Sequence, residues 1–110
     1  FMLKRFRSVM AGLVVYPEQM MRNLELTRGI VFSGTLLLKL VDHGMAREDA
    51  YRLVQKHAMA AWEGGAAFPE RVRSDADIQS SVPVKLMDEV FDLKRHLAHV
   101  DMIFDRAIAA

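Results

Sequence analysis

The sequence predicts an all-α fold, a compact helical bundle of about five to six helices. Apolar residues recur at spacings of three and four along almost the whole chain of 110 residues, which is typical of helices that bury one face. Alternation of period two occurs only at residues 13–16, and this stretch is too short to start a sheet. The apolar fraction of 52% and the charged fraction of 26% are those of a globular domain with one hydrophobic core.

Glycine and proline mark the ends of the first two predicted helices. The first helix ends at Gly12, and no capping Ser, Thr, Asp or Asn precedes its apolar pattern. We therefore expect residues 1–12 to be the end of a helix that continues from a missing upstream region, and residues 13–110 to form the domain itself. Pro17 and Glu18 open the second helix, because proline has a preset φ and an acidic side chain complements the helix dipole.

The second helix is expected to run on to Val41 and to become apolar on nearly all sides over residues 30–41. A helix of this kind lies at the centre of a core. Arg28 and Lys39 bracket an apolar stretch shorter than the roughly 20 residues that a membrane span needs. Gly44 is expected to end the helix in the left-handed conformation that glycine adopts easily.

The second half of the chain contains shorter predicted helices. A helix with acidic residues in its first turn follows Gly44 and ends before residues 64–65, and a helical turn restarts at residues 68–70. Residues 73–81 are expected to be a polar connector with little order, in which Asp75 and other Asp and Ser residues act as local caps. Asp92 is expected to cap a final helix. The buried face of the helix after Gly44 is expected to consist of Ala50, Leu53, Val54, Ala58, Ala61 and Trp62.

Charge and cysteine content exclude several classes of function. The net charge of +1 gives no basic field that would bind nucleic acid or anionic lipid, and only Lys4, Arg5 and Arg7 are locally basic. The chain has no cysteine, which excludes disulfides, thiolate chemistry and cysteine metal sites and fits a reducing compartment. We expect a cytoplasmic protein that binds neither nucleic acid nor membrane.

The histidines are the first candidates for chemistry. His96 and His99 are three residues apart and could share a helix face with Asp92, a trio that could in principle hold a metal. Hydrogen bonding on a solvated helix face explains the same trio more simply. His43, at a helix end, and His57, within an apolar face, are interpreted as structural.

No motif for catalysis or cofactor binding occurs in the chain, such as a phosphate loop, a dinucleotide fingerprint, a zinc-binding helix pair or a nucleophile elbow. Ser33 and Thr35 have no base beside them in the sequence, and their hydroxyls are expected to bond to the preceding helical turn. We therefore assign no catalytic residue, no cofactor-binding residue and no metal ligand. The residues alone predict a helical packing or assembly module.

Residues 12–24, Gly-Leu-Val-Val-Tyr-Pro-Glu-Gln-Met-Met-Arg-Asn-Leu, are similar to a stretch typical of adenylosuccinate lyases near the start of their third domain. The likeness continues in the same order and covers nearly the whole chain. The chain thus resembles the C-terminal domain of this family, which belongs to the fumarase/aspartase superfamily. The other matching segments are residues 32–33, 44–45, 47–51, 54–55, 58–63, 91–92 and 97–106.

The resemblance implies a parent enzyme that eliminates fumarate from adenylosuccinate, and from its carboxamide-ribotide relative, in purine biosynthesis without a metal or organic cofactor. The family's acid, base and phosphate-binding residues belong to earlier regions, so no residue of this chain inherits such a role. The resemblance also implies that residues 1–12 are the end of a helix of the missing central bundle domain and that residues 13–110 are the C-terminal domain. The implied partners are the remainder of the lyase subunit and the neighbouring subunits of a homotetramer. The isolated chain is expected to be inactive.

Three departures from the family pattern leave open whether the parent is a standard lyase or a diverged paralogue. Gly34 and Thr35 stand where Gln-Arg is usual, and a glycine within a helix costs about 1 kcal/mol relative to alanine. Ala46 replaces a capping Ser, a change worth roughly 1 kcal/mol. Residues 82–84, Val-Pro-Val, replace Leu-Ser-Pro and are expected to shift the start of the next helix.

Two other hypotheses about the function of the chain stay open. It could be an independent interaction or self-association module that uses a stripe of Met20, Met21 and Leu24. It could also be a domain of a related carboxymuconate cycloisomerase-like enzyme, although residues 12–24 argue against this second alternative.

Overall fold

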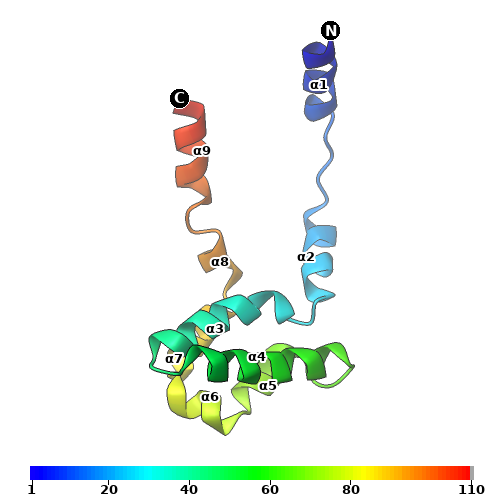
Figure 1. Cartoon of the computed structure of the whole chain (residues 1–110). Coiled ribbons are helices and arrows are strands. Elements are labelled where there is room, and N and C mark those ends of the chain that lie inside the picture. Colours follow the sequence, from blue (N-terminus) through cyan, green and yellow to red (C-terminus); the bar gives the residue numbers. More distant parts are fainter. Residues whose placement is uncertain (110) are drawn as a thin grey trace.

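The computed structural model describes residues 1–109, and every regular element in this range is helical (Figure 1). The all-α prediction is confirmed, and the chain is divided into more helices than the five to six expected. In chain order they are α1 (Met2–Ala11), α2 (Pro17–Glu25), the 3-10 helix η1 (Ile30–Phe32), α3 (Ser33–Asp42), α4 (Arg47–Trp62), α5 (Phe68–Arg73), α6 (Ala76–Ser81), α7 (Val84–Val90), α8 (Leu93–His96) and α9 (Val100–Ala109).

The helices form a packed core with two arms that extend from it on the same side (Figure 1). The helical core, residues 30–91, has α3 packed on α4 and on α7, and α5 packed on α4 and α6. The N-terminal arm consists of α1, α2 and the segment between them, and the C-terminal arm consists of α8 and α9. The arms give the molecule extents of 59 × 33 × 23 Å.

The interior of the helical core consists of aliphatic side chains around an aromatic cluster. The ring of Phe91 lies edge-on to Phe68, with centroids 6.2 Å apart, and edge-on to Phe32, at 5.8 Å. Each fully buried aliphatic or aromatic side chain contributes about 1.5–3 kcal/mol to folding. Those with essentially no exposed surface are Phe68, Leu36, Leu40, Ile78, Val72, Val82 and Val90.

The prediction of one continuous helix from Pro17 to Val41 is wrong. Helix α2 ends at Glu25, and α3 begins at Ser33. Arg28 and Gly29 lie between them with φ values of 53° and 83°, which a right-handed helix cannot contain. Helix α2 buries no residue, whereas α3 buries two leucines, so the expected central position holds for α3 alone.

Helix α4 begins and ends close to the predicted positions. Gly44 has a φ of 95°, which confirms the left-handed end of the preceding helix. Ala50, Val54 and Ala61 of α4 are buried as expected. Trp62 is 70% exposed, so its assignment to the buried face is wrong, because its position at the end of α4 directs the ring away from the core.

Residues 73–81 are more ordered than expected. Most of this segment forms α6, whose Ile78 is fully buried in the helical core. The side chain of Asp75 accepts hydrogen bonds from the backbone N–H groups of Asp77 and Ile78, at 3.0 and 3.2 Å, which confirms its capping role. Burial of Ile78 stabilises a helix that its polar sequence did not indicate.

The end of the chain forms two helices where one was expected. Asp92 accepts a hydrogen bond from the N–H of Lys94 at 2.9 Å, so it does cap a helix. That helix, α8, has only four residues, and a turn separates it from α9. No helix in residues 1–109 is both long and apolar enough to cross a membrane.

Ala46 is the N-cap residue of α4 and provides no side-chain hydrogen bond there. We expect Ala46→Ser to raise the free energy of unfolding by about 1 kcal/mol, because the hydroxyl accepts a bond from an unpaired N–H of the first turn. Urea denaturation followed by circular dichroism measures this change. Ala107→Ser, on the exposed face of α9, is the control without a capping position, and an equal gain there would contradict the explanation.

Candidate functional site

A buried ionisable pair joins α4 to the start of α6. The Nε2 atom of His57 lies 2.8 Å from Oδ2 of Asp75, and the two side chains are 6% and 12% exposed. The other carboxylate oxygen of Asp75, Oδ1, caps α6. The Nδ1 atom of His57 has no hydrogen-bond partner among the described residues. Both oxygens of Asp75 are therefore occupied by the fold, which makes the pair a structural link between two helices.

The pKa of the Asp75 carboxyl is lowered from its ordinary value. Burial raises the pKa, since it penalises the charged form. Hydrogen bonds from the N–H of Ile78, from His57 and from the N–H of Asp77, together with the charge of His57, favour the carboxylate and outweigh burial. The folded state therefore stabilises the ionised form of Asp75.

The lowered pKa of Asp75 predicts a loss of stability in acid. An aspartate in the unfolded chain has a pKa of about 3.9, so the contribution is fully present above this value and is lost as the pH falls through the lower folded pKa. The amide of Asp75→Asn does not titrate. We therefore expect the melting temperature of this variant to fall less below about pH 4 than the melting temperature of the unsubstituted chain. Thermal unfolding by circular dichroism at a series of acidic pH values tests this, and parallel declines would refute it.

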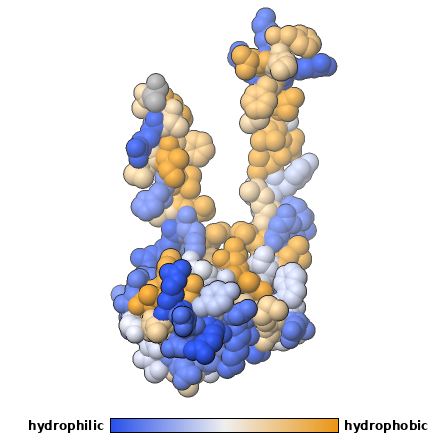
Figure 2. Space-filling view, viewed as in Figure 1, coloured by the Kyte–Doolittle hydropathy of each residue, from blue (hydrophilic) through white to orange (hydrophobic). Residues whose placement is uncertain are grey.

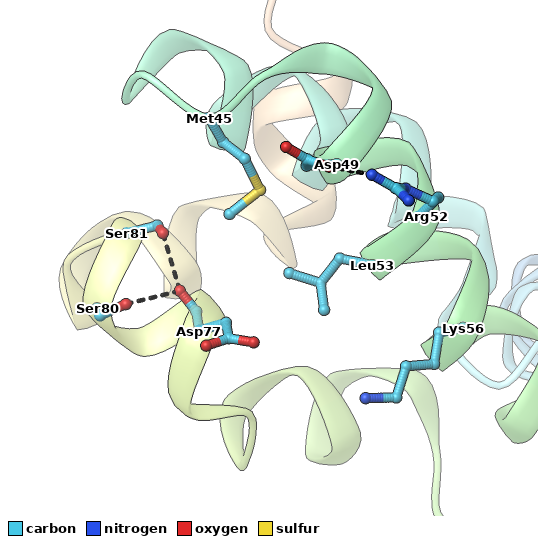
Figure 3. Close-up of a pocket in the computed structure, with 8 residues that line it drawn as sticks. All are labelled: Met45, Asp49, Arg52, Leu53, Lys56, Asp77, Ser80 and Ser81. Carbon is cyan, nitrogen blue, oxygen red and sulfur yellow. Dashed lines mark hydrogen bonds and ion pairs between the residues drawn. The ribbon is translucent and has the colours of Figure 1, made fainter.

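A shallow groove of about 560 Å³ separates α4 from α6 (Figure 3). Its polar groups largely bond to one another. Asp49 pairs with Arg52, and the hydroxyls of Ser80 and Ser81 donate to the carbonyl oxygen of Asp77 at 2.9 and 2.8 Å. Two cationic and two anionic side chains line the groove, so their charges cancel. The complete lining is Met45, Asp49, Arg52, Leu53, Lys56, Asp77, Ser80 and Ser81.

A smaller cavity of about 240 Å³ lies beside α3 and α8 and is lined by Thr35, Lys39, Glu89, Arg95 and His96. Arg95 and Glu89 form an ion pair with each other. Neither this cavity nor the groove combines a hydroxyl nucleophile with a hydrogen-bonded base, which is the arrangement that nucleophilic catalysis needs.

Two of the three residues of the metal hypothesis, Asp92 and His96, have other contacts. Asp92 is the cap of α8, and the ring of His96 lies 5.2 Å from the ring of Phe32. Within residues 1–109, no group of three or more His, Asp or Glu side chains is arranged to hold a metal ion. The Nδ1 atom of His43 lies 2.8 Å from the carbonyl oxygen of Lys39, which agrees with the structural role predicted for this residue.

His57 was expected to be structural, but its link to Asp75 was not predicted. The two residues are 18 positions apart, and Asp75 was interpreted only as a local cap. One signal was present in the sequence. A polar side chain on a buried helix face needs a hydrogen-bond partner, and a capping carboxylate has a second oxygen to offer.

The arms carry exposed apolar side chains. None of α1, α2, α8 and α9 buries a residue, and Figure 2 shows apolar surface along both arms and on the part of the core between them. Continuous apolar surface of this kind marks a site of protein packing. The exposed large apolar residues of the arms include Phe1, Met2, Leu3, Phe6, Val9, Met10, Leu13, Val14, Val15, Tyr16, Met20, Met21, Leu97, Met102, Ile103, Phe104 and Ile108.

These features define a class of protein. A packed helical core, with two arms that expose apolar faces in the described residues, is typical of a helical domain that packs against a larger protein body.

Comparison with known proteins identifies which family this domain comes from. Residues 29–107 match the family described as Adenylosuccinate lyase C-terminus, and the chain belongs to this family. The chain is 42% identical to the adenylosuccinate lyase of Bacillus subtilis (strain 168) over 106 residues, and 44% identical to that of a Synechocystis species over 108 residues. Each alignment covers 96% of this chain and 25% of the relative, so the chain spans about a quarter of their length. The resemblance seen in the sequence is confirmed.

Proposed function

We propose that the chain is the C-terminal packing domain of an adenylosuccinate lyase. The parent enzyme eliminates fumarate from adenylosuccinate, and from its carboxamide-ribotide relative, in purine biosynthesis. It acts in the cytoplasm. The single observation that carries this proposal is the apolar surface of the two arms, in a chain that spans about a quarter of the length of its relatives. Such a surface requires a protein body of the kind that the other three quarters of the relatives represent.

The domain contributes surface and rigidity to this enzyme, and the reactive groups come from elsewhere in the subunit. Elimination needs a base for the Cβ proton, an acid for the departing nitrogen and groups that hold the substrate in place. His57, the most buried histidine of the chain, is bonded to Asp75 and lines neither the groove nor the smaller cavity described above. We therefore propose no catalytic residue, metal ligand or cofactor-binding residue in this chain.

The N-terminal arm extends the domain toward the centre of the enzyme. We propose that α1, within residues 1–12, is the end of a helix of the central bundle domain, and that residues 13–110 are the C-terminal domain. The family match begins at Gly29, so α1 and α2 lie outside it, which supports a different packing environment for this arm. The remainder of the subunit and the neighbouring subunits of a homotetramer are the proposed partners of the exposed faces.

A chimeric enzyme tests the proposed function. In it, this chain replaces the aligned quarter of the Bacillus subtilis adenylosuccinate lyase. We expect the chimera to release fumarate from adenylosuccinate, whereas the purified chain alone and the Bacillus enzyme without its aligned quarter release none. A soluble chimera of the correct oligomeric mass without activity would contradict the proposal, as would turnover by the isolated chain.

A self-association module is the second candidate function, because Met20 and Met21 are half-exposed and share one face of α2 with Leu24. This reading requires a defined dimer or higher oligomer of the chain alone. Light scattering over a range of concentrations measures the mass. The double variant Met20→Gln, Met21→Gln is expected to dissociate such an oligomer. An active chimera together with a monomeric chain would exclude self-association and support the role as a lyase domain.

A further inference from the structure

We propose that Arg28 and Gly29 form a rigid joint that holds the N-terminal arm at one fixed angle to the helical core. The joint consists of residues 27–29 on the side of the arm and residues 65–69, the loop between α4 and α5 with the start of α5, on the side of the core. The proposal concerns the conformation of this chain and does not depend on the lyase activity.

The backbone of Arg28 is the first observation. Its φ of 53° is the only positive value at a non-glycine residue in residues 1–109. Side chains with a Cβ disfavour this conformation, so a residue keeps it only where the surrounding structure determines it strongly. The turn after α2 is therefore held by contacts outside its own sequence.

Two hydrogen bonds supply these contacts. The N–H of Phe68 donates to the carbonyl oxygen of Arg28 at 3.0 Å, and the guanidinium of Arg28 donates to the carbonyl oxygen of Gly65. Phe68 is fully buried in the helical core, so its N–H has a fixed position. The backbone and the side chain of one residue are thus both attached to the loop that follows α4.

Gly29 closes the joint by its close approach to Pro69. A Cβ at position 29 would lie 2.6 Å from Cδ and 2.8 Å from Cγ of Pro69, and the φ of Gly29 is 83°. Pro69 is the second residue of α5, and its ring has little freedom to move. Only glycine fits here, both for its backbone conformation and for the space available.

The joint determines the direction of the arm because α1 and α2 have no buried residue that would fix the arm on the core. Both helices stand away from the core in Figure 1. On the side of the arm, the hydroxyl of Thr27 donates to the carbonyl oxygen of Leu24 at 2.7 Å, which continues α2 into the turn. On the side of the core, the N–H of Ile30 donates to the carbonyl oxygen of Thr27 at 3.0 Å. The apolar face of the arm is therefore presented in one orientation before any partner binds.

Spin-label distance measurements test the joint in the full chain. The chain has no cysteine, so Glu25→Cys and Gln55→Cys give one unique pair of labels across the joint, on the exposed surfaces of α2 and α4. We expect a single narrow distance distribution in this background. Gly29→Ala is expected to shift its maximum or broaden it, and Arg28→Ala is expected to broaden it through loss of the bond to Gly65.

Gly34→Ala is the matched control, since a Cβ added there meets no atom within 4 Å, and its distribution is expected to stay the same. Pro69→Ala added to Gly29→Ala removes the close contact and is expected to restore part of the original distribution. Far-ultraviolet circular dichroism verifies that each variant keeps its helices, and Arg28→Ala decides the question where Gly29→Ala does not fold. A broad distribution in the labelled background, or unchanged distributions in folded Gly29→Ala and Arg28→Ala, would overturn the proposal.

Discussion

Replacing Phe68 with alanine is expected to lower the free energy of unfolding by about 3–5 kcal/mol. The side chain of Phe68 has no exposed surface, and its ring packs edge-on against Phe91 at 6.2 Å. The loss combines the transfer of a large apolar group with the cavity that its removal leaves between α5 and its neighbours. The expected loss is close to half of the free energy of unfolding of an ordinary small domain.

Urea denaturation followed by circular dichroism measures this loss. Phe104→Ala in α9 is the matched control, because Phe104 is 61% exposed in the described structure. We expect the control to change the unfolding free energy by no more than about 0.5 kcal/mol, as surface substitutions usually do. Similar losses in the two variants would mean that the helical core is not the stable unit of this chain.

The second large effect is expected at Asp75, where alanine should cost about 2–4 kcal/mol. The loss of the cap of α6 accounts for about 1 kcal/mol. A further 1–3 kcal/mol, roughly, comes from His57, whose Nε2 atom is left buried without its partner. The two terms add because different oxygens of the same carboxylate make the two sets of contacts.

Two control variants separate these terms. Asp92→Ala removes a cap of the same kind at an exposed position and should cost about 1 kcal/mol or less. His57→Leu combined with Asp75→Ala removes both partners and should recover most of the second term, since replacing both partners of a buried bond is nearly neutral. If the double variant is as unstable as Asp75→Ala alone, the buried histidine does not account for the loss.

Local chemistry made several helix ends predictable. Gly12, Pro17 and Gly44 end or open helices in the structure as they were expected to, because each of these residue types restricts or frees the backbone at its own position. The caps at Asp75 and Asp92 were predictable for the same reason, since a cap bonds to backbone groups two or three residues away.

The break between α2 and α3 was not predictable in this way. The periodic apolar pattern continues through residues 26–32, and the left-handed turn at Arg28 is maintained by Gly65 and Phe68, which lie 37 and 40 positions further along the chain. Helix α6 was missed because burial of Ile78 stabilises it, and its own composition does not. The partner of His57 was missed because its contact with Asp75 exists only in the folded chain.

The double contact of Asp75 also has a kinetic consequence. A six-residue helix such as α6 is too short to be stable alone, and an unsupported one would fray rapidly. Because the carboxylate that starts α6 also satisfies a histidine inside α4, opening α6 leaves α4 with an unmet polar group. The backbone amides of the two helices should therefore exchange with deuterated solvent at related rates, as members of one cooperative unit.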